Sequence, residues 1–299
     1  MANLPQVPTF NIPEVKLSSS SGGRNMPVIG MGTMADPFDE AVLKEAVLEA
    51  IKAGYRHFDT AALYKSEKPL GEAMAEAIEA GLIKSRDELF VTSKLWCTDA
   101  HHDLVLPALK NSLRMLQLEY LDLYLIHWPL SAKPGKIGFP VPKDEQLPLD
   151  STQCGQPWKI ARVNQVEISP LWQQQKLRGF CKSKGVVLTA YSPLGAKGTR
   201  WGTDEVMDNE TLKEIAKAHN KTVAQVCLRW AFEQGLTFVV KSFNKERMRE
   251  NLQIFDWELT SDDYKQINKI KQHRLMPKPE MVSPNGPFKS PEELWDGEI

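Results

Sequence analysis

Short apolar stretches alternate with longer amphipathic stretches along most of the chain. The apolar stretches are typical of strands buried on both faces, and they fall at residues 28–33, 57–61, 89–96, 121–128, 163–169, 186–191 and 238–242. Between them, apolar residues recur at helical spacing. Residues 39–53 are an example: Leu43, Val47 and Ile51 share one face, and Gly54 provides the stop. This alternation predicts an α/β fold built on a parallel sheet.

The number of predicted strands is one short of a closed barrel. Seven strands are predicted, whereas a (β/α)8 barrel has eight. The irregular segment is residues 129–162, where six prolines occur and no helical pattern is visible. Because a parallel crossover normally contains a helix, a long structureless connection here argues that something is absent. We therefore expect a barrel of the TIM type that lacks one β/α unit, with the join between residues 150 and 162.

The rest of the chain is predicted to belong to the same domain, which spans residues 1–299. Residues 1–14 form an N-terminal extension, and the polar stretch 18–23 is predicted to be the turn of a hairpin. Residues 271–299, which contain five prolines, are predicted to be an irregular C-terminal tail that wraps the barrel.

Composition excludes several classes of function. The formal net charge is −1 and the isoelectric point is about 6.6, so we expect no binding to nucleic acid or to an anionic membrane surface. No signal peptide and no apolar run of about 18 residues is visible. The four cysteines are widely spaced, which predicts reduced thiols in a cytoplasmic protein; no Cys/His cluster suggests a metal site. We expect a monomer.

Four side chains that could do chemistry lie at the ends of three predicted strands. They are Asp59 and Tyr64 after the second strand, Lys94 on the third, and His127 on the fourth. Active sites of repeating strand–helix proteins are built at these carboxyl ends. Each residue alone is better explained as structural, as a buried ion pair, a packed ring or a satisfied histidine. The four together favour an active site.

These residues stand in motifs that closely resemble those of the aldo-keto reductase family. The first three motifs are Gly54-Tyr-Arg-His-Phe-Asp59-Thr-Ala-x-x-Tyr64, Leu89-Phe-Val-Thr-Ser-Lys94-Leu-Trp96 and Leu121-Asp-Leu-Tyr-Leu-Ile-His127-Trp128-Pro. Later motifs are Val163-Asn-Gln165, Ala190-Tyr191-Ser192-Pro-Leu194-Gly and Lys241-Ser242-Phe-Asn244-x-x-Arg247-x-x-Glu250-Asn251. The resemblance runs from about residue 15 to the end. The tail resembles the plant branch that includes chalcone, codeinone and methylecgonone reductases.

The resemblance implies reduction of an aldehyde or ketone by NADPH, because no side chain can donate hydride. Tyr64 would be the general acid. Its ordinary pKa is about 10, and we expect the Lys94 ammonium, oriented by Asp59, to lower that pKa. His127 would donate a hydrogen bond to the carbonyl oxygen. Trp96 and Trp128 would line an apolar substrate pocket, although core packing is almost as good an explanation for either.

The cofactor residues are likewise implied by the resemblance. Lys241, Ser242, Asn244 and Arg247 would bind the adenosine 2′-phosphate at the start of a helix, which favours NADPH over NADH. Glu250 and Asn251 would contact the adenine. Tyr191 would stack on the nicotinamide, and Gln165 would contact its carboxamide. The remaining residues assigned to the cofactor are Gly32, Thr33, Ser192 and Leu194.

One family motif is missing. Members of the family have a Gly-Val-Ser-Asn-Phe-like turn between the motifs of His127 and Gln165, and its Ser and Asn hold the carboxamide. No such turn occurs in this sequence. An alternative function therefore stays open: a shortened, catalytically impaired relative that only binds NADPH or a partner. A third, weaker hypothesis is another barrel enzyme with a phosphate site, such as an isomerase.

Overall fold

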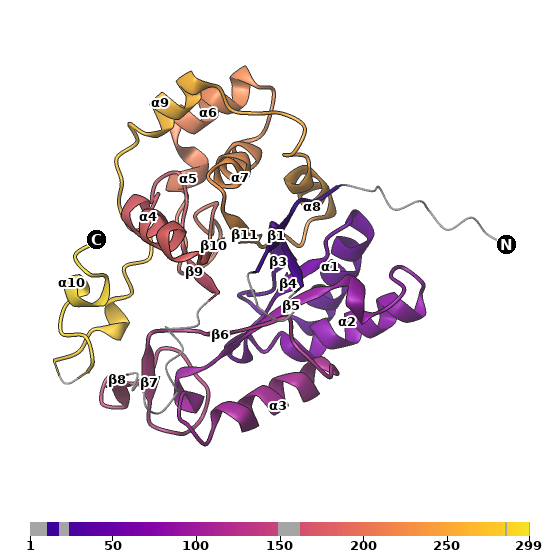
Figure 1. Cartoon of the computed structure of the whole chain (residues 1–299), viewed down its shortest axis with the longest axis vertical. Helices are drawn as coiled ribbons and strands as arrows, with labels where there is room; N and C mark the ends of the chain where they lie inside the picture. The colour runs from indigo at the N-terminus through magenta and orange to yellow at the C-terminus, as the bar shows by residue number, and fades with distance from the viewer. Residues whose placement is uncertain (1–10, 18–23, 149–161, 285, 299) are drawn as a thin grey trace.

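The fold is a curled parallel sheet covered by helices on its outer face (Figure 1). The computed structural model describes residues 11–17, 24–148, 162–284 and 286–298. Within these residues the sheet has seven strands, in the order β6-β5-β4-β3-β11-β10-β9. Their bounds are β3 (Ile29–Gly32), β4 (His57–Asp59), β5 (Phe90–Leu95), β6 (Leu123–Ile126), β9 (Val163–Glu167), β10 (Val187–Tyr191) and β11 (Thr237–Val240). The predicted α/β class and the strand count are confirmed.

The sheet is open between β6 and β9. Every described neighbouring pair is parallel, and β6 and β9 are the two edge strands. A closed barrel would carry one further strand between them. The join expected between residues 150 and 162 falls mostly on residues 149–161, which lie outside the described part of the chain.

Ten α-helices are described, and most of them cover the sheet. They are α1 (Glu40–Ala53), α2 (Glu67–Glu79), α3 (Val105–Leu116), α4 (Gln175–Lys184), α5 (Glu205–Asp208), α6 (Glu210–Ala218), α7 (Val223–Glu233), α8 (Lys245–Leu252), α9 (Ser261–Ile267) and α10 (Pro291–Leu294). Helices α1, α2 and α3 lie outside β3 to β6, and α4, α7 and α8 lie outside β9 to β11 (Figure 1). Their apolar faces form one large core with the sheet.

Local sequence explains where α1 begins and ends. The Asp39 side chain accepts a hydrogen bond from Val42 N, and Gly54 takes a left-handed conformation with φ 109°. The start of α2 has no such cap, although a serine, Ser66, precedes the helix. Ser66 makes no capping bond, because its hydroxyl instead bonds the hydroxyls of Thr33 and Thr60, each at 2.8 Å.

The expected N-terminal hairpin is present and pairs β1 (Glu14–Lys16) with β2 (Asn25–Pro27) in antiparallel fashion.

Two parts of the chain that were predicted to be irregular, residues 129–162 and the C-terminal tail, also contain regular structure. A second hairpin, β7 (Leu130–Ala132) with β8 (Gln146–Pro148), was not expected. It packs on the C-terminal tail, which forms the 3-10 helix η5 (Pro279–Met281) and α10. Gln146 donates a hydrogen bond to Glu280 O at 2.9 Å. The distant tail therefore covers the hairpin.

Candidate active site

A buried ion pair lies at the carboxyl ends of β4 and β5. Asp59 and Lys94 are 3% and 2% exposed, and Lys94 Nζ donates to Asp59 Oδ1 at 2.5 Å and to Thr60 O at 2.9 Å. Gln165, on the far edge strand β9, donates to the other Asp59 oxygen at 2.8 Å. The Asp59 carboxylate therefore accepts from Lys94 and Gln165, and the Lys94 ammonium has Asp59 and Thr60 O as acceptors, so that both charges of the buried pair are compensated.

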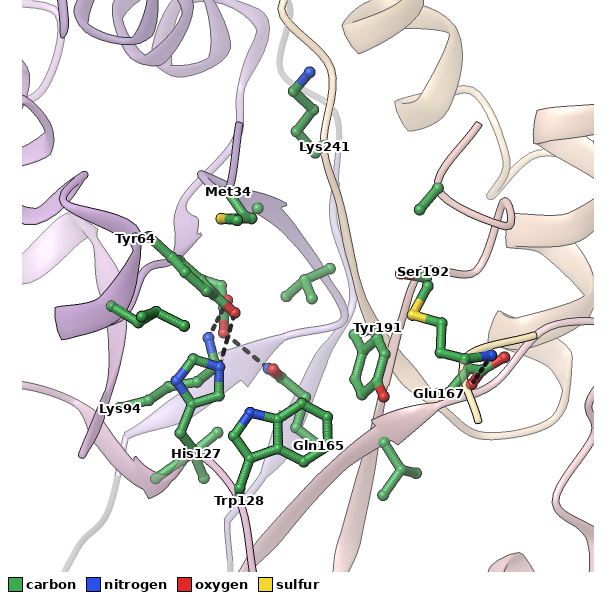
Figure 2. A pocket seen from close by; sticks show the side chains of 18 of the residues that line it. Met34, Tyr64, Lys94, His127, Trp128, Gln165, Glu167, Tyr191, Ser192 and Lys241 are labelled. Atoms are coloured by element: carbon green, nitrogen blue, oxygen red, sulfur yellow. Dashed lines mark hydrogen bonds and ion pairs between the residues drawn. The ribbon is translucent and has the colours of Figure 1, made fainter. Parts of the chain in front are cut away.

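Tyr64 and His127 face each other beside this pair. Tyr64 ends the 3-10 helix η1 (Ala62–Tyr64), and His127 follows β6. The Tyr64 hydroxyl and His127 Nε2 share a hydrogen bond of 3.2 Å. Lys94 Nζ lies 4.9 Å from the centre of the Tyr64 ring. The structure therefore brings together all four residues predicted from the strand ends, and Figure 2 shows three of them, Tyr64, Lys94 and His127, beside one another.

The pKa of Tyr64 differs from the expectation. Lys94 was expected to lower this pKa, but the pKa of Tyr64 is raised, first by burial and then by the negative charge of Asp59. The ammonium of Lys94 bonds Asp59, so its effect on the phenol is largely offset. In the protein without ligand, Tyr64 is a neutral phenol.

His127 is neutral as well. Its pKa lies well below the ordinary value, because of burial and of the positive charges of Lys94 and Lys278. Its Nδ1 is buried and has no hydrogen-bond partner among the described residues. A neutral imidazole and a neutral phenol can each donate a hydrogen bond to a carbonyl oxygen, and neither group needs to be charged to do so.

The four residues lie at one wall of a cavity of about 790 Å³. Trp128 and Tyr191 both line it, and Figure 2 shows Tyr191 across the cavity from Tyr64. Trp96 does not line it: this ring is 0% exposed and packs edge-on against His127, at 5.1 Å between ring centres. Trp96 supports His127 from behind, as the packing alternative for this residue anticipated.

Basic residues gather at the start of α8, where the resemblance places the 2′-phosphate. Asn244 caps the helix by accepting from Arg247 N at 2.9 Å, and Ser242 Oγ accepts from Asn244 N at 3.2 Å. Burial and the charge of Arg247 lower the pKa of Lys241. Two cations that repel each other beside a helix N-terminus form a donor set that suits a phosphate.

The other predicted cofactor residues are partly where expected. Gly32, Thr33, Ser192 and Leu194 line the cavity together with Gln165. Glu250 and Asn251 lie on α8, but Asn251 is 3% exposed and bonds the Tyr55 hydroxyl, so its side chain belongs to the core.

Several lining residues were not predicted. Phe139 comes from the segment between β7 and β8, and Arg274, Met276, Lys278 and Trp295 come from the C-terminal tail. The tail was expected to wrap the barrel, and its cationic and aromatic residues are the feature of the sequence that could have indicated a contribution to the cavity. Which of them reach the cavity depends on contacts far apart in sequence. Glu167, for example, accepts from Leu275 N at 2.9 Å and Met276 N at 3.2 Å.

Comparison with known proteins assigns the chain to a family. The Aldo/keto reductase family profile matches residues 28–154 and 149–272. The chain belongs to the aldo/keto reductase family. It is 50% identical to deoxymugineic acid synthase 1-A of Triticum aestivum, over 92% of this chain and 97% of the relative. It is also 50% identical to NADPH-dependent codeinone reductase 1-4 of Papaver somniferum, over 95% of this chain and 98% of the relative. The predicted family and the prediction of an oxidoreductase are confirmed.

A solved structure supports the fold. A Bombyx mori aldo-keto reductase in complex with NADP has a TM-score of 0.76 and 33% identity, over 89% of this chain and 95% of that chain. As in that reductase family, the sheet is of the TIM-barrel type.

The alignments also support the missing unit. The alignment with the wheat synthase has 304 positions but covers 92% of 299 residues, so about 30 positions have no residue of this chain opposite them. The alignment with the poppy reductase, 317 positions over 95% of the chain, leaves about the same number. One strand and its helix need roughly this length. The family profile matches in two parts that meet at residues 149–154, inside the segment where the unit was predicted to be absent.

Among the described residues of this reductase, no helix has the length and apolar character needed to cross a membrane.

Proposed function

We propose that this protein is an NADPH-dependent reductase that converts an aldehyde or ketone to an alcohol, with Tyr64 as the general acid. The observation that carries the proposal is the cluster at the cavity wall: the Tyr64 hydroxyl lies 3.2 Å from His127 Nε2, next to the buried Asp59–Lys94 pair. The NADPH-dependent reductase and the NADP-bound structure among its relatives support the cofactor.

The residues present fit this cofactor. Lys241 and Arg247 at the start of α8 would hold the 2′-phosphate, with Ser242 and Asn244 beside them. Tyr191 would stack on the nicotinamide. When bound, NADPH supplies the hydride that no side chain can supply.

Tyr64 and His127 would act on the carbonyl oxygen. The neutral His127 ring donates a hydrogen bond that orients the oxygen. When the carbonyl carbon is reduced, the electron pair of the C=O π bond would move to oxygen, which would become strongly basic. Tyr64 would then give its hydroxyl proton to this oxygen, which completes the alcohol. The new phenolate would lie beside Lys94, whose ammonium is 4.9 Å from the ring centre; its bond to Asp59 offsets part of the stabilisation that the ammonium would give.

Gln165 has a different partner from the one the resemblance implies. Its amide nitrogen donates to Asp59 at 2.8 Å. To contact a nicotinamide carboxamide, the Gln165 side chain must leave Asp59 or use its amide oxygen. Since the Ser–Asn turn of the family is absent from the sequence, we expect weaker retention of the nicotinamide ring than in full-length relatives.

The test is oxidation of NADPH, followed by absorbance at 340 nm, with a panel of aldehydes and ketones. Turnover by the folded wild-type protein, and its loss in Tyr64→Phe, supports the proposal. General acid catalysis contributes about 10²- to 10⁴-fold, so the loss should be of that size. Equal inactivity of both proteins, each with a cooperative melt, would reject it.

The second candidate, a relative that binds NADPH without turnover, is favoured by the open edge of the sheet. Strands β6 and β9 both line the cavity, so its wall is discontinuous in the described part of the barrel. An increase of the melting temperature with NADPH, without consumption of NADPH, would favour this candidate.

A further inference from the structure

A lysine of the C-terminal tail reaches the substrate end of the cavity. Lys278 precedes η5 and lines the same cavity as His127 and Trp128. Its side chain is 13% exposed, and Nζ lies 5.8 Å from the centre of the Trp128 ring and 5.4 Å from that of Phe139. These distances are near the outer limit of a cation–π contact, so the rings only partly stabilise the charge.

The ring of Trp128 links the ammonium to the reacting groups and sets an upper limit on the distance between them. The Trp128 ring is stacked on His127, with 6.1 Å between centres and an interplanar angle of 4°. Together with the distance from Lys278 to Trp128, this places the ammonium within about 12 Å of the His127 ring. The charge of Lys278 is also the third cause, after burial and Lys94, of the low pKa of His127.

Arg274, another cation that lines the cavity, is held by neighbouring groups. The Arg274 guanidinium lies between the rings of Trp172 and Trp295, at 4.8 and 3.8 Å from their centres, and donates to Glu298 O. Glu167, which also lines the cavity, accepts two backbone N–H groups of the tail. Lys278 has one ion-pair partner among the described residues, Glu280, at a long 3.8 Å. The Glu167 carboxylate also feels the charge of Lys278, which partly offsets the rise of the Glu167 pKa caused by burial, but no ion pair joins the two side chains among the described residues. A largely buried ammonium whose described ion-pair partner is this distant favours an anion from outside.

We propose that Lys278 determines substrate specificity by binding a carboxylate on the carbonyl substrate. The substrate would place its carbonyl at Tyr64 and His127 and its carboxylate at Lys278, with an apolar spacer of about one aromatic ring against Trp128 and Phe139. This inference rests on the proposed reductase function and adds a substrate class to it: oxo acids and formyl acids in preference to their neutral esters.

The experiment compares 4-carboxybenzaldehyde with methyl 4-formylbenzoate, which differ in charge but have the same reacting group. The quantity measured is the ratio of kcat/KM for the acid to that for the ester, with NADPH. The ratio cancels effects that Lys278 has on His127, since both substrates experience them. We expect the ratio to fall about tenfold in Lys278→Met, which corresponds to about 1.4 kcal/mol, and to be largely retained in Lys278→Arg.

Two further variants test whether the effect on the ratio has the expected sign and whether it is specific to Lys278. Glu280→Gln removes the distant counter-charge, so the ratio should rise. Lys136→Met removes an exposed lysine of the segment between β7 and β8 that does not line the cavity, and the ratio should stay at the wild-type value. A ratio that is the same in wild type, Lys278→Met and Glu280→Gln would overturn the inference and show that Lys278 only packs the tail against Trp128.

A binding measurement keeps this test separate from the test of the reductase function. Calorimetric titration of 4-(hydroxymethyl)benzoate and its methyl ester, in the presence of NADP⁺, needs no turnover. Tighter binding of the acid to wild type than to Lys278→Met supports the carboxylate site even where no aldehyde is reduced. Turnover of the ester by all variants, with equal affinity for both alcohols, supports the reductase and rejects the site.

Discussion

The Asp59–Lys94 pair allows a stability prediction that separates a buried ion pair from a surface one. Both side chains are less than 5% exposed, and Lys94 Nζ lies 2.5 Å from Asp59 Oδ1. The substitution Asp59→Asn removes the counter-charge and leaves the ammonium inside the barrel. Breaking a buried pair on one side costs about 3–5 kcal/mol, because an uncompensated charge remains.

The expected loss is large enough to measure in a thermal melt. With an unfolding entropy of about 2.1 cal/mol/K per residue, it lowers the melting temperature of a chain of 299 residues by roughly 5–8 °C. The double variant Asp59→Asn/Lys94→Met removes both charges, so we expect it to regain most of the loss. A double-mutant cycle should then give a coupling free energy of at least about 2 kcal/mol.

A surface pair provides the control. Lys68 and Glu72 lie 3.7 Å apart with side chains 51% and 36% exposed, so Glu72→Gln should change the free energy of unfolding by less than about 1 kcal/mol. If Asp59→Asn costs no more than this control, or if the double variant is as unstable as Asp59→Asn, the ammonium is not held by Asp59 as described.

Three further predictions concern the cofactor, acid stability and the tail. In Arg247→Met, KM for NADPH should rise about tenfold and KM for NADH should not change, since only the 2′-phosphate loses a partner; an equal rise for both would contradict this role. Burial lowers the pKa of His57 to about 4, whereas the same side chain in the unfolded protein takes up a proton below about pH 6.5. The free energy of unfolding, measured with urea, should therefore fall by about 3 kcal/mol between pH 6.5 and 4. This fall should be smaller in His57→Gln. In Glu167→Gln, one of the two oxygens that accept from the backbone N–H groups of Leu275 and Met276 is replaced by a donor. The free energy of unfolding should fall by about 1–3 kcal/mol, and proteolysis of the tail should become faster. Unchanged cleavage rates would exclude this anchoring role.

Local sequence was sufficient for most of the sheet and helices. Helix α1 begins after Asp39 and ends before Gly54, as its apolar spacing and the glycine predicted, because caps and apolar spacing act within a few residues. The β7–β8 hairpin was not predictable in this way. Its bond from Gln146 to Glu280 joins residues 134 positions apart, and the tail that covers it has no regular pattern.

The candidate active site likewise has features that local sequence predicts and features that depend on contacts far apart in the chain. The strand ends alone indicated that Asp59, Tyr64, Lys94 and His127 would meet, since parallel strands end at one edge of a sheet. The pKa of Tyr64 could not be predicted from the motif, because it is set by burial, and burial depends on elements far apart in the chain. The bond from Gln165 to Asp59, which crosses the cavity, likewise depends on the curvature of the sheet.

The central claim is that this shortened reductase still brings hydride and the Tyr64 proton to one carbonyl. The most direct measurement uses NADPH carrying deuterium at C4 of the nicotinamide and mass spectrometry of the alcohol formed in a single turnover. We predict deuterium on the carbinol carbon with the wild-type protein, and a rate about 10²- to 10⁴-fold lower with Tyr64→Phe. A folded wild-type protein that binds NADPH and transfers no deuterium to any carbonyl tested would contradict the claim.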